Sequence, residues 1–225
     1  MVNKLFLILL MITGSICTFA QTTNVDSLRN AKRDSTLRAM IAADSIKVMK
    51  EYEMKEKEDK MEARMIYPFI KGGKGSGVLP VSDPTEITDP NIDYKILFEL
   101  TGNNPDSIIK EVNGGLDEIA RVINLHVASG VPAKRIFPVI VVHAGALHAL
   151  KNNEAFQKKY KIDNPSIKLI NDLKNMGGKF IVCGQAMQFL DIKKEELLPD
   201  IKIALTAQTA LSQYQLKGYV WHPVW

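Results

Sequence analysis

The chain has 225 residues, with 29 Lys and Arg against 25 Asp and Glu, which gives a formal net charge of +4 at pH 7. This weak charge gives no reason to expect a nucleic acid partner. The chain has only two cysteines, Cys17 and Cys183, so a framework of several disulfides is excluded.

Residues 1–20 have the pattern of a secretory signal peptide. Lys4 precedes an apolar run at 5–12, and the small residue Ala20 comes directly before Gln21. The apolar run is shorter than the roughly 20 residues that a bilayer-spanning helix needs, so an uncleaved anchor is the weaker interpretation. We therefore predict cleavage after Ala20, a periplasmic or secreted protein, and no membrane span after signal removal.

Residues 21–66 form a charged segment for which we predict a long, mostly exposed helix. No Gly or Pro occurs between residues 26 and 64, and an imperfect apolar stripe includes Leu37, Ile41 and Val48 at helical spacing. This stripe is too broken to predict a coiled coil, but pairing with a second copy of the chain stays open.

Residues 67–93 are an irregular connection rich in Gly and Pro. The glycines at 72–77 have the composition of a phosphate-binding loop, but the Walker spacing is absent and no helical pattern follows. We predict a flexible connection, or a loop that wraps the following domain.

Residues 94–225 alternate strand and helix signals, as expected of one α/β domain. The apolar run at 139–142 is typical of a parallel strand that is covered on both faces. We predict a three-layer, open, flavodoxin-like parallel sheet of about five strands flanked by helices and preceded by the long N-terminal helix. The predicted strands are 96–100, 137–142, 180–182, 201–205 and 219–221.

Two Asn-Pro pairs predict helix starts, because Asn caps a helix and Pro suits the first helical position. The pair at 104–105 precedes an apolar face that runs over 108–123, and the pair at 164–165 precedes a second helix. Two further short helices are predicted around 195–198 and over 210–216.

Ligands of an open parallel sheet bind at the carboxyl ends of its strands, so the residues directly after the strands are site candidates. We expect Cys183 to be the only cysteine of the mature chain, either as a reactive nucleophile or as a small buried hydrophobe. His143 is a candidate acid, base or hydrogen-bond partner, unless its ring only bonds to backbone at the strand end. The candidate ligand-binding residues are Gly145, Gly184, Gln185, Thr101 and Asn103.

No cofactor or metal is predicted. His143 and His148 are five residues apart with no Glu or Cys close by, which makes a weak metal site. The sequence also lacks the nucleophile elbow of hydrolases and the glycine fingerprint of dinucleotide enzymes.

The chain contains Cys-Gly-Gln at 183–185, together with characteristic pieces at 94–101, 139–145, 196–199 and 218–223. Through these pieces, of which Cys-Gly-Gln is the most specific, residues 94–225 resemble the DsrE family of small sulfur-metabolism proteins. The resemblance implies a three-layer α/β fold that assembles as a trimer or hexamer.

In the sulfur-relay members of this family, a cysteine after the third strand carries a persulfide between partner proteins. Cys183 occupies that position, so the resemblance implies a sulfur carrier, or sulfurtransferase-like protein, with a sulfur donor and an acceptor protein as partners. His143 and the backbone N–H groups near Gly184 and Gln185 would stabilise the charge on sulfur.

A different class of function stays open beside the carrier. The same edge of the sheet could bind a small ligand or a partner in a non-catalytic envelope protein, so whether the chain is an enzyme is left open. A thiol redox enzyme is a weaker third candidate, because it would need a resolving cysteine that the mature chain lacks.

Overall fold

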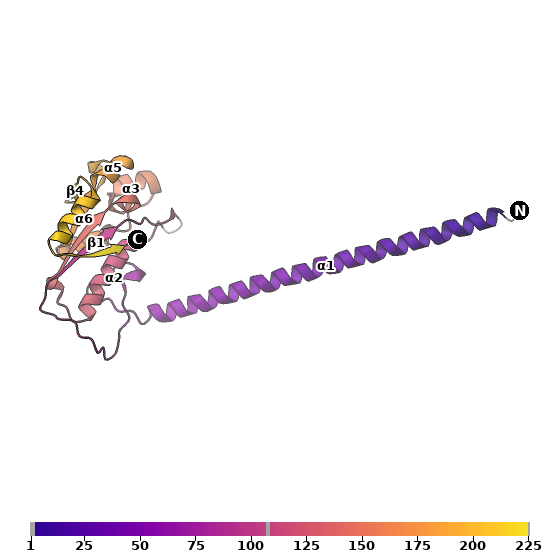
Figure 1. The fold of residues 1–225 in the computed structure, drawn as a ribbon, viewed down its shortest axis with the longest axis horizontal. Coiled ribbons are helices and arrows are strands. Elements are labelled where there is room, and N and C mark those ends of the chain that lie inside the picture. The colour runs from indigo at the N-terminus through magenta and orange to yellow at the C-terminus, as the bar shows by residue number, and fades with distance from the viewer. Residues whose placement is uncertain (1–2, 107–108, 225) are drawn as a thin grey trace. The chain divides into compact units, whose positions relative to one another are not determined.

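The computed structural model describes residues 3–106 and 109–224, with side chains from residue 28 onward in those ranges. The chain divides into two compact units, Met1–Lys60 and Met61–Trp225 (Figure 1). The side chains of the predicted signal peptide lie outside the described residues, and its cleavage stays a prediction. Over the residues that are described, none of the helices is long and apolar enough to cross a bilayer.

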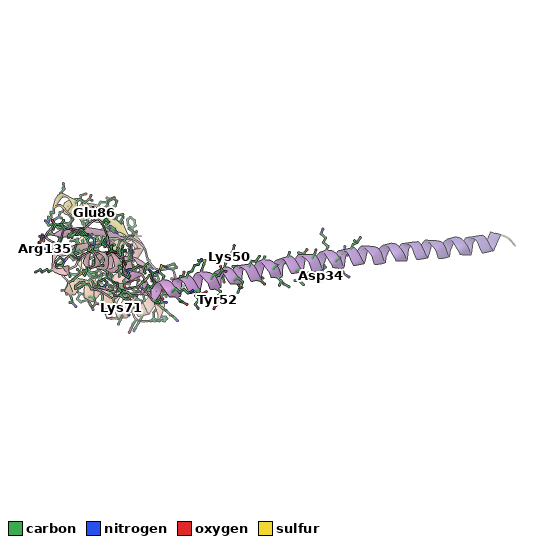
Figure 2. The ribbon with its side chains drawn as sticks, turned by 90° about the horizontal axis from the view of Figure 1, so that it is seen from below. Asp34, Lys50, Tyr52, Lys71, Glu86 and Arg135 are labelled. Atoms are coloured by element: carbon green, nitrogen blue, oxygen red, sulfur yellow. The ribbon has the colours of Figure 1, made fainter. Side chains whose placement is uncertain are left out.

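The first unit is built from helix α1 (Asn3–Glu62), which confirms the predicted long helix over 28–62. The side chains over 28–60 are exposed, and Figure 2 shows Asp34, Lys50 and Tyr52 along it. Asp34 bonds Arg38 across one turn at 2.9 Å, and Glu56 bonds Lys60 at 2.7 Å. Such exposed pairs stabilise a helix by only a few tenths of a kcal/mol each, about 0.3–0.5.

The second unit contains the predicted five-stranded sheet, in the order β4-β3-β2-β1-β5. All four strand pairings are parallel. The strands are β1 (Tyr94–Leu100), β2 (Ile136–Val142), β3 (Lys179–Cys183), β4 (Lys202–Ala204) and β5 (Val220–Val224). The predicted fold class is therefore confirmed, with strand ends shifted by at most three residues.

Helices cover both faces of this sheet. The side chains of β1 and β2 are apolar on both faces, and burying them requires a layer of helices on each side. Phe98 and Ile140 pack into one core cluster with residues of α2 and α4. Leu97 and Val139 face the other way and pack into a second cluster with residues of α6. The helices are α2 (Gly114–Ala128), α3 (Asn153–Tyr160), α4 (Ile167–Asn175), α5 (Gly184–Phe189) and α6 (Ala207–Leu216), and the 3-10 helices are η1 (Lys74–Ser76), η3 (Ala133–Arg135), η4 (Ala144–Leu150) and η5 (Lys194–Glu196).

The helix start predicted at 104–105 is wrong, since α2 begins at Gly114 and is capped by Asn113. The Asn104 amide instead donates to the carbonyls of Glu111 and Val112, and its oxygen accepts from the N–H of Gly114. Asn104 therefore closes the loop before the helix. Residue 108, predicted on the apolar face, lies outside the described residues.

The helix predicted after 164–165 is present as α4, but its N-cap is Ser166 rather than Asn164. The Asn164 amide donates to the carbonyls of Ala149 and Lys151, so this side chain ties the α4 start to the end of η4. In both Asn-Pro pairs, the Asn is not the N-cap residue of the following helix, and its amide donates to backbone carbonyls outside that helix.

Residues 67–80 wrap the domain, as one of the two predicted alternatives states. The side chain of Asn124, fully buried on α2, makes four hydrogen bonds to this segment. Its Oδ1 accepts from the N–H groups of Phe69 (3.1 Å) and Ile70 (2.9 Å), and its Nδ2 donates to the carbonyls of Ile70 (2.7 Å) and Ser76 (2.8 Å).

The glycines of this segment lie against the Asp117 carboxylate on α2, whose Oδ1 accepts a hydrogen bond from the Gly73 N–H at 2.7 Å. A Cβ on Gly72 or Gly73 would lie 2.6 or 2.8 Å from the carboxylate oxygens, too close for any side chain. Burial raises the pKa of Asp117, although its hydrogen bonds to Gly73, Gly75 and Ser76 oppose this. The backbone N–H groups of this loop therefore donate to the Asp117 carboxylate within the domain.

We expect Asn124→Ala to destabilise the second unit by about 2–4 kcal/mol, because four backbone groups, most of them buried, lose their partner at once. Denaturant unfolding measures the loss, and limited proteolysis should open the chain within 67–80. The control is Asn171→Ala, which removes an exposed Asn from α4. Equal stability of the two variants would contradict the role given to Asn124.

Candidate functional site

A cleft of about 660 Å³ opens at the carboxyl ends of the strands, where the sequence predicts a site. Its lining comes from the ends of β1, β2 and β3, from the start of η4, from both ends of the short helix α5 and from the start of α6. The lining residues are Glu99, His143, Ala144, Gly145, Cys183, Gln185, Ala186, Phe189, Leu190, Thr206, Ala207, Gln208 and Leu211.

Cys183 is the last residue of β3 and the N-cap of α5. Its Sγ accepts a hydrogen bond from the backbone N–H of Ala186 at 3.4 Å, and the residue is 6% exposed. Cys183 therefore lies in the cleft wall, with a donor next to sulfur and little contact with solvent. It is the only free cysteine in the part of the chain whose side chains are described.

His143 follows β2 and lies in the same cleft. Its Nε2 is 2.9 Å from Oε1 of Glu99 on β1, while the other oxygen of Glu99 accepts from the indole N–H of Trp221 on β5 at 2.8 Å. The side chains of Glu99 and His143 are 15% and 28% exposed. Glu99 thus links three neighbouring strands at the edge where the cleft opens.

The backbone turns sharply between His143 and the next residue. His143 is extended, with φ −148° and ψ −178°, and Ala144 has a positive φ of 52°. A residue with a Cβ pays roughly 1–2 kcal/mol in this left-handed region. Hydrogen bonds hold the turn, since the His143 N–H donates to Leu100 and the Ala146 N–H donates to Thr101, both at 3.0 Å.

The predicted ligand-binding residues divide into two groups. Gly145 and Gln185 line the cleft together with Cys183 and His143. Thr101 and Asn103 are not among the lining residues; they lie behind Gly145, where an added Cβ would come 3.2 Å from the Cβ of Asn103.

Gly184, also predicted to bind ligand, lines a neighbouring groove with Met187 and Ile203 rather than the cleft. A Cβ at Gly184 would lie 2.9 Å from the Ala204 carbonyl oxygen. Its glycine therefore allows β3 and β4 to approach closely at the strand ends.

Sequence reasoning missed Glu99 and Trp221, and it missed the apolar part of the cleft. An acidic residue within an otherwise apolar strand was the available signal for Glu99. Phe189 is 88% exposed at the cleft, beside the 38% exposed Leu190. The arrangement combines a thiol and a carboxylate-bound imidazole with apolar walls, which suits a polarisable, weakly hydrated reacting group such as sulfur.

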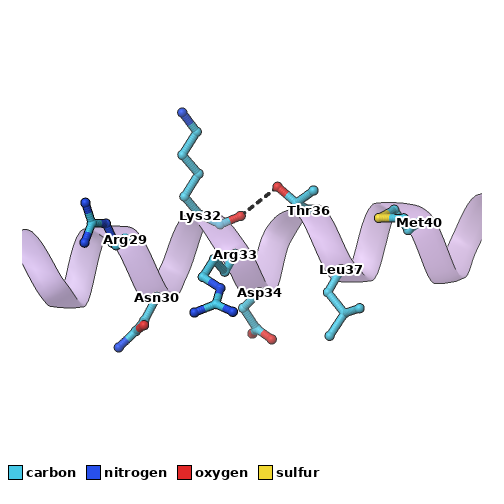
Figure 3. A pocket seen from close by; sticks show the side chains of 8 residues that line it. All are labelled: Arg29, Asn30, Lys32, Arg33, Asp34, Thr36, Leu37 and Met40. Carbon is cyan, nitrogen blue, oxygen red and sulfur yellow. Dashed lines mark hydrogen bonds between the residues drawn. The ribbon is translucent and has the colours of Figure 1, made fainter.

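No group of three or more His, Cys, Asp or Glu side chains that could hold a metal occurs among the described residues. A further hollow on α1 is lined by residues of successive turns of that one helix, including Arg29, Lys32 and Leu37. Figure 3 shows these side chains and the bond from the Thr36 hydroxyl to the Lys32 carbonyl. With all its lining on one helix surface, this hollow encloses nothing and is not a candidate site.

His148, on η4, lies outside the cleft lining. Its ring packs edge-on against Tyr160, and its Nδ1 is buried with no hydrogen-bond partner. Burial, together with the nearby positive charges of Lys159 and Lys151, lowers the pKa of His148 from 6.5 to about 4.

This shift predicts a loss of stability in mild acid. The unfolded chain binds a proton at His148 near pH 6.5 and the folded chain only near pH 4, so stability is complete above pH 6.5 and falls between these values. We expect this residue to contribute about 2 kcal/mol of lost stability between pH 8 and pH 5. Unfolding of His148→Phe at both pH values should show a smaller loss than the native chain; an equal loss would contradict the assignment.

Three comparisons relate the chain to known proteins. The sequence model of the DsrE/DsrF-like family matches residues 111–221. No curated protein matches the chain. Among solved structures, a protein of unknown function, MTH1491 from Methanobacterium thermoautotrophicum, is 15% identical with a TM-score of 0.44, over 58% of this chain and 99% of that one. The YchN protein from E. coli is 15% identical with a TM-score of 0.41, over 58% and 97%.

The family match extends from the start of α2 to β5 and includes both His143 and Cys183. The matched range contains strands β2, β3 and β4 and the first residues of β5. Over residues 111–221, the α/β domain is therefore identified as DsrE/DsrF-like.

Proposed function

We propose that the α/β domain is a sulfur carrier that forms a persulfide on Cys183. The observation that carries the proposal is the cleft itself, in which Cys183 of a DsrE/DsrF-like chain faces the same space as a carboxylate-bound His143. A nucleophile near a potential base that is held by a third group is the arrangement that activates thiols and hydroxyls in enzymes.

The transfer has two balanced steps. The Cys183 thiolate attacks the outer sulfur of a donor, the bond between that sulfur and the rest of the donor breaks, and the donor leaves as a thiolate. With thiosulfate as donor, sulfite leaves instead. An acceptor thiolate then attacks the outer sulfur of the persulfide, and Cys183 leaves as thiolate, so no net oxidant is needed.

The surroundings of Cys183 support such chemistry. The Ala186 N–H donates to Sγ, and a donor of this kind stabilises a negative sulfur better than a neutral one. The walls formed by Leu190, Ala207 and Leu211 shield an attached sulfur from water. The outer sulfur of a persulfide would occupy the cleft, where a donor or an acceptor can reach it.

The proposal includes assembly and partners. A trimer or hexamer is typical of the family, and a donor and an acceptor protein must each reach the cleft in turn. Phe189, 88% exposed at the cleft, and Leu205, 76% exposed after β4, are apolar side chains that such contacts would cover.

We also infer that the protein is exported, from the N-terminal pattern alone. Expression in a Gram-negative host with an intact secretion pathway should give a periplasmic product whose mass corresponds to a chain beginning at Gln21. Replacing Ala20 by a bulky residue (Ala20→Leu) should leave the precursor uncleaved, since the cleavage site needs a small residue. A cytoplasmic product of full mass from the native chain would contradict export.

A non-catalytic binding role is the second candidate, and the burial of the thiol favours it. Cys183 is only 6% exposed, and much of the cleft lining is apolar. Free cysteine is among the most buried residues in proteins and often serves only in packing. In that case, the cleft would bind an apolar small ligand or a partner in the cell envelope.

Sulfur loading separates these two functions. The purified protein is treated with a low-molecular-weight persulfide, or with thiosulfate, and its intact mass is measured. The carrier function predicts the gain of one sulfur atom, removed by a thiol reductant and absent in Cys183→Ser. Cys183→Ser should keep native stability within about 1 kcal/mol, so lost loading is not a folding effect. No sulfur gain in the native chain, under either donor, would contradict the carrier function.

A further inference from the structure

Glu99 holds His143 in one orientation through contacts that occupy both carboxylate oxygens. Oε1 lies 2.9 Å from Nε2 of His143, and Oε2 accepts from the Trp221 indole N–H at 2.8 Å. An indole nitrogen can only donate, so Trp221 ties down one oxygen and leaves the other for the imidazole. The pair is largely shielded from water, with the Glu99 side chain 15% exposed.

These contacts determine which ring nitrogen of His143 carries the proton. A carboxylate can only accept, so the Nε2 that faces Glu99 must be the protonated nitrogen of the neutral ring. Nδ1 then has a free lone pair. Among the described residues, no hydrogen bond to Nδ1 of His143 occurs, and the ring lines the cleft with Cys183.

We propose that Glu99 is a positioning residue that fixes His143 as the Nε2-protonated tautomer, which makes Nδ1 the base that takes the proton from the Cys183 thiol. This inference deepens the proposed function and rests on it for its biological purpose, although thiol activation can be measured without any sulfur transfer. Trp221 acts indirectly, because its indole N–H holds the Glu99 carboxylate in place.

The proton balance is simple. The S–H bond of Cys183 breaks, an N–H bond forms at Nδ1, and a thiolate–imidazolium pair results. The negative charge of Glu99 stabilises the imidazolium through the bond to Nε2. When Cys183 leaves the transferred sulfur as a thiolate, the proton on Nδ1 is available to return to it. No oxidant or cofactor enters this step.

Other charges do not compete with this pair at the cleft. Glu99, His143 and Cys183 are the titratable groups of the lining, which contains no Lys, Arg or Asp in the described part of the chain. The pH dependence of the thiol should therefore report mainly on these three groups. Trp221, packed against Glu99 from β5, is neutral at all relevant pH values.

Glu99→Gln tests the proposal because it keeps the shape and reverses one hydrogen bond. Gln can accept from Trp221 with its oxygen and donate to Nε2 of His143 with its amide. The ring then carries its proton on Nδ1, where it can no longer accept the thiol proton. We expect the alkylation rate of Cys183 at pH 7 to fall at least about tenfold.

The ¹⁵N chemical shifts of the His143 imidazole report which ring nitrogen carries the proton. If Glu99 served only to stabilise the fold, Glu99→Gln would leave these shifts unchanged. In the full chain, His143, assigned by its loss in His143→Ala, should show Nε2 protonated, and in Glu99→Gln it should show Nδ1 protonated. Glu99→Gln should have no further effect on alkylation in a His143→Ala background, because its action passes through His143. The matched control is Glu118→Gln, which removes a carboxylate paired with Arg121 on α2.

The role of Glu99 and the carrier function can each be contradicted independently of the other. An Nδ1-protonated His143 in the native chain, or an unchanged alkylation profile in Glu99→Gln, overturns the role of Glu99 even if Cys183 loads sulfur. A native chain that loads no sulfur, yet loses thiol reactivity in Glu99→Gln, contradicts the carrier function and supports the Glu99–His143 pair.

Discussion

The parallel sheet imposes the constraint on which the candidate site depends. Helices cover both faces of β1 and β2, so side chains such as Phe98 and Val139 must be apolar, and polar groups can reach solvent only at the strand ends. Because all five strands run the same way, their carboxyl ends share one edge. The thiol of Cys183 at the end of β3 and the imidazole of His143 after β2 therefore line one cleft, although the two residues are 40 positions apart in the chain.

Two unfavourable features meet at His143, and they act together. The left-handed backbone of Ala144 costs stability, and Glu99 takes a carboxylate into a largely covered position. Hydrogen bonds to Leu100 and Trp221 compensate for part of each cost. A histidine that only filled space would need neither feature. Their joint effect is to fix the ring of His143 at the cleft, which is what a base requires.

Features set by neighbouring residues in the sequence could be predicted, whereas features set by contacts between distant parts of the chain could not. Apolar runs such as 139–142 identified the strands, since burial on both faces leaves a local signal. The role of Glu99 could not be predicted, because it requires β1 to lie between β2 and β5, and strand order arises from contacts far apart in the chain. The helix start predicted at Asn104 was wrong because an Asn before a Pro is favourable in loops as well as at helix N-caps.

The role of segment 67–80 also depends on contacts with residues that are distant in the sequence, in this case polar side chains on α2. Asp117 and Asn124 lie seven residues apart on α2, on the face that carries Leu116 and Ile123 into the core. Buried polar groups at that spacing require partners, and the glycine-rich segment provides them through its backbone. A glycine-rich loop was therefore an ambiguous signal for phosphate until the polar groups on the neighbouring helix were counted. The internal carboxylate of Asp117 occupies the N–H groups that a phosphate would use, and the loop belongs to the fold rather than to the site.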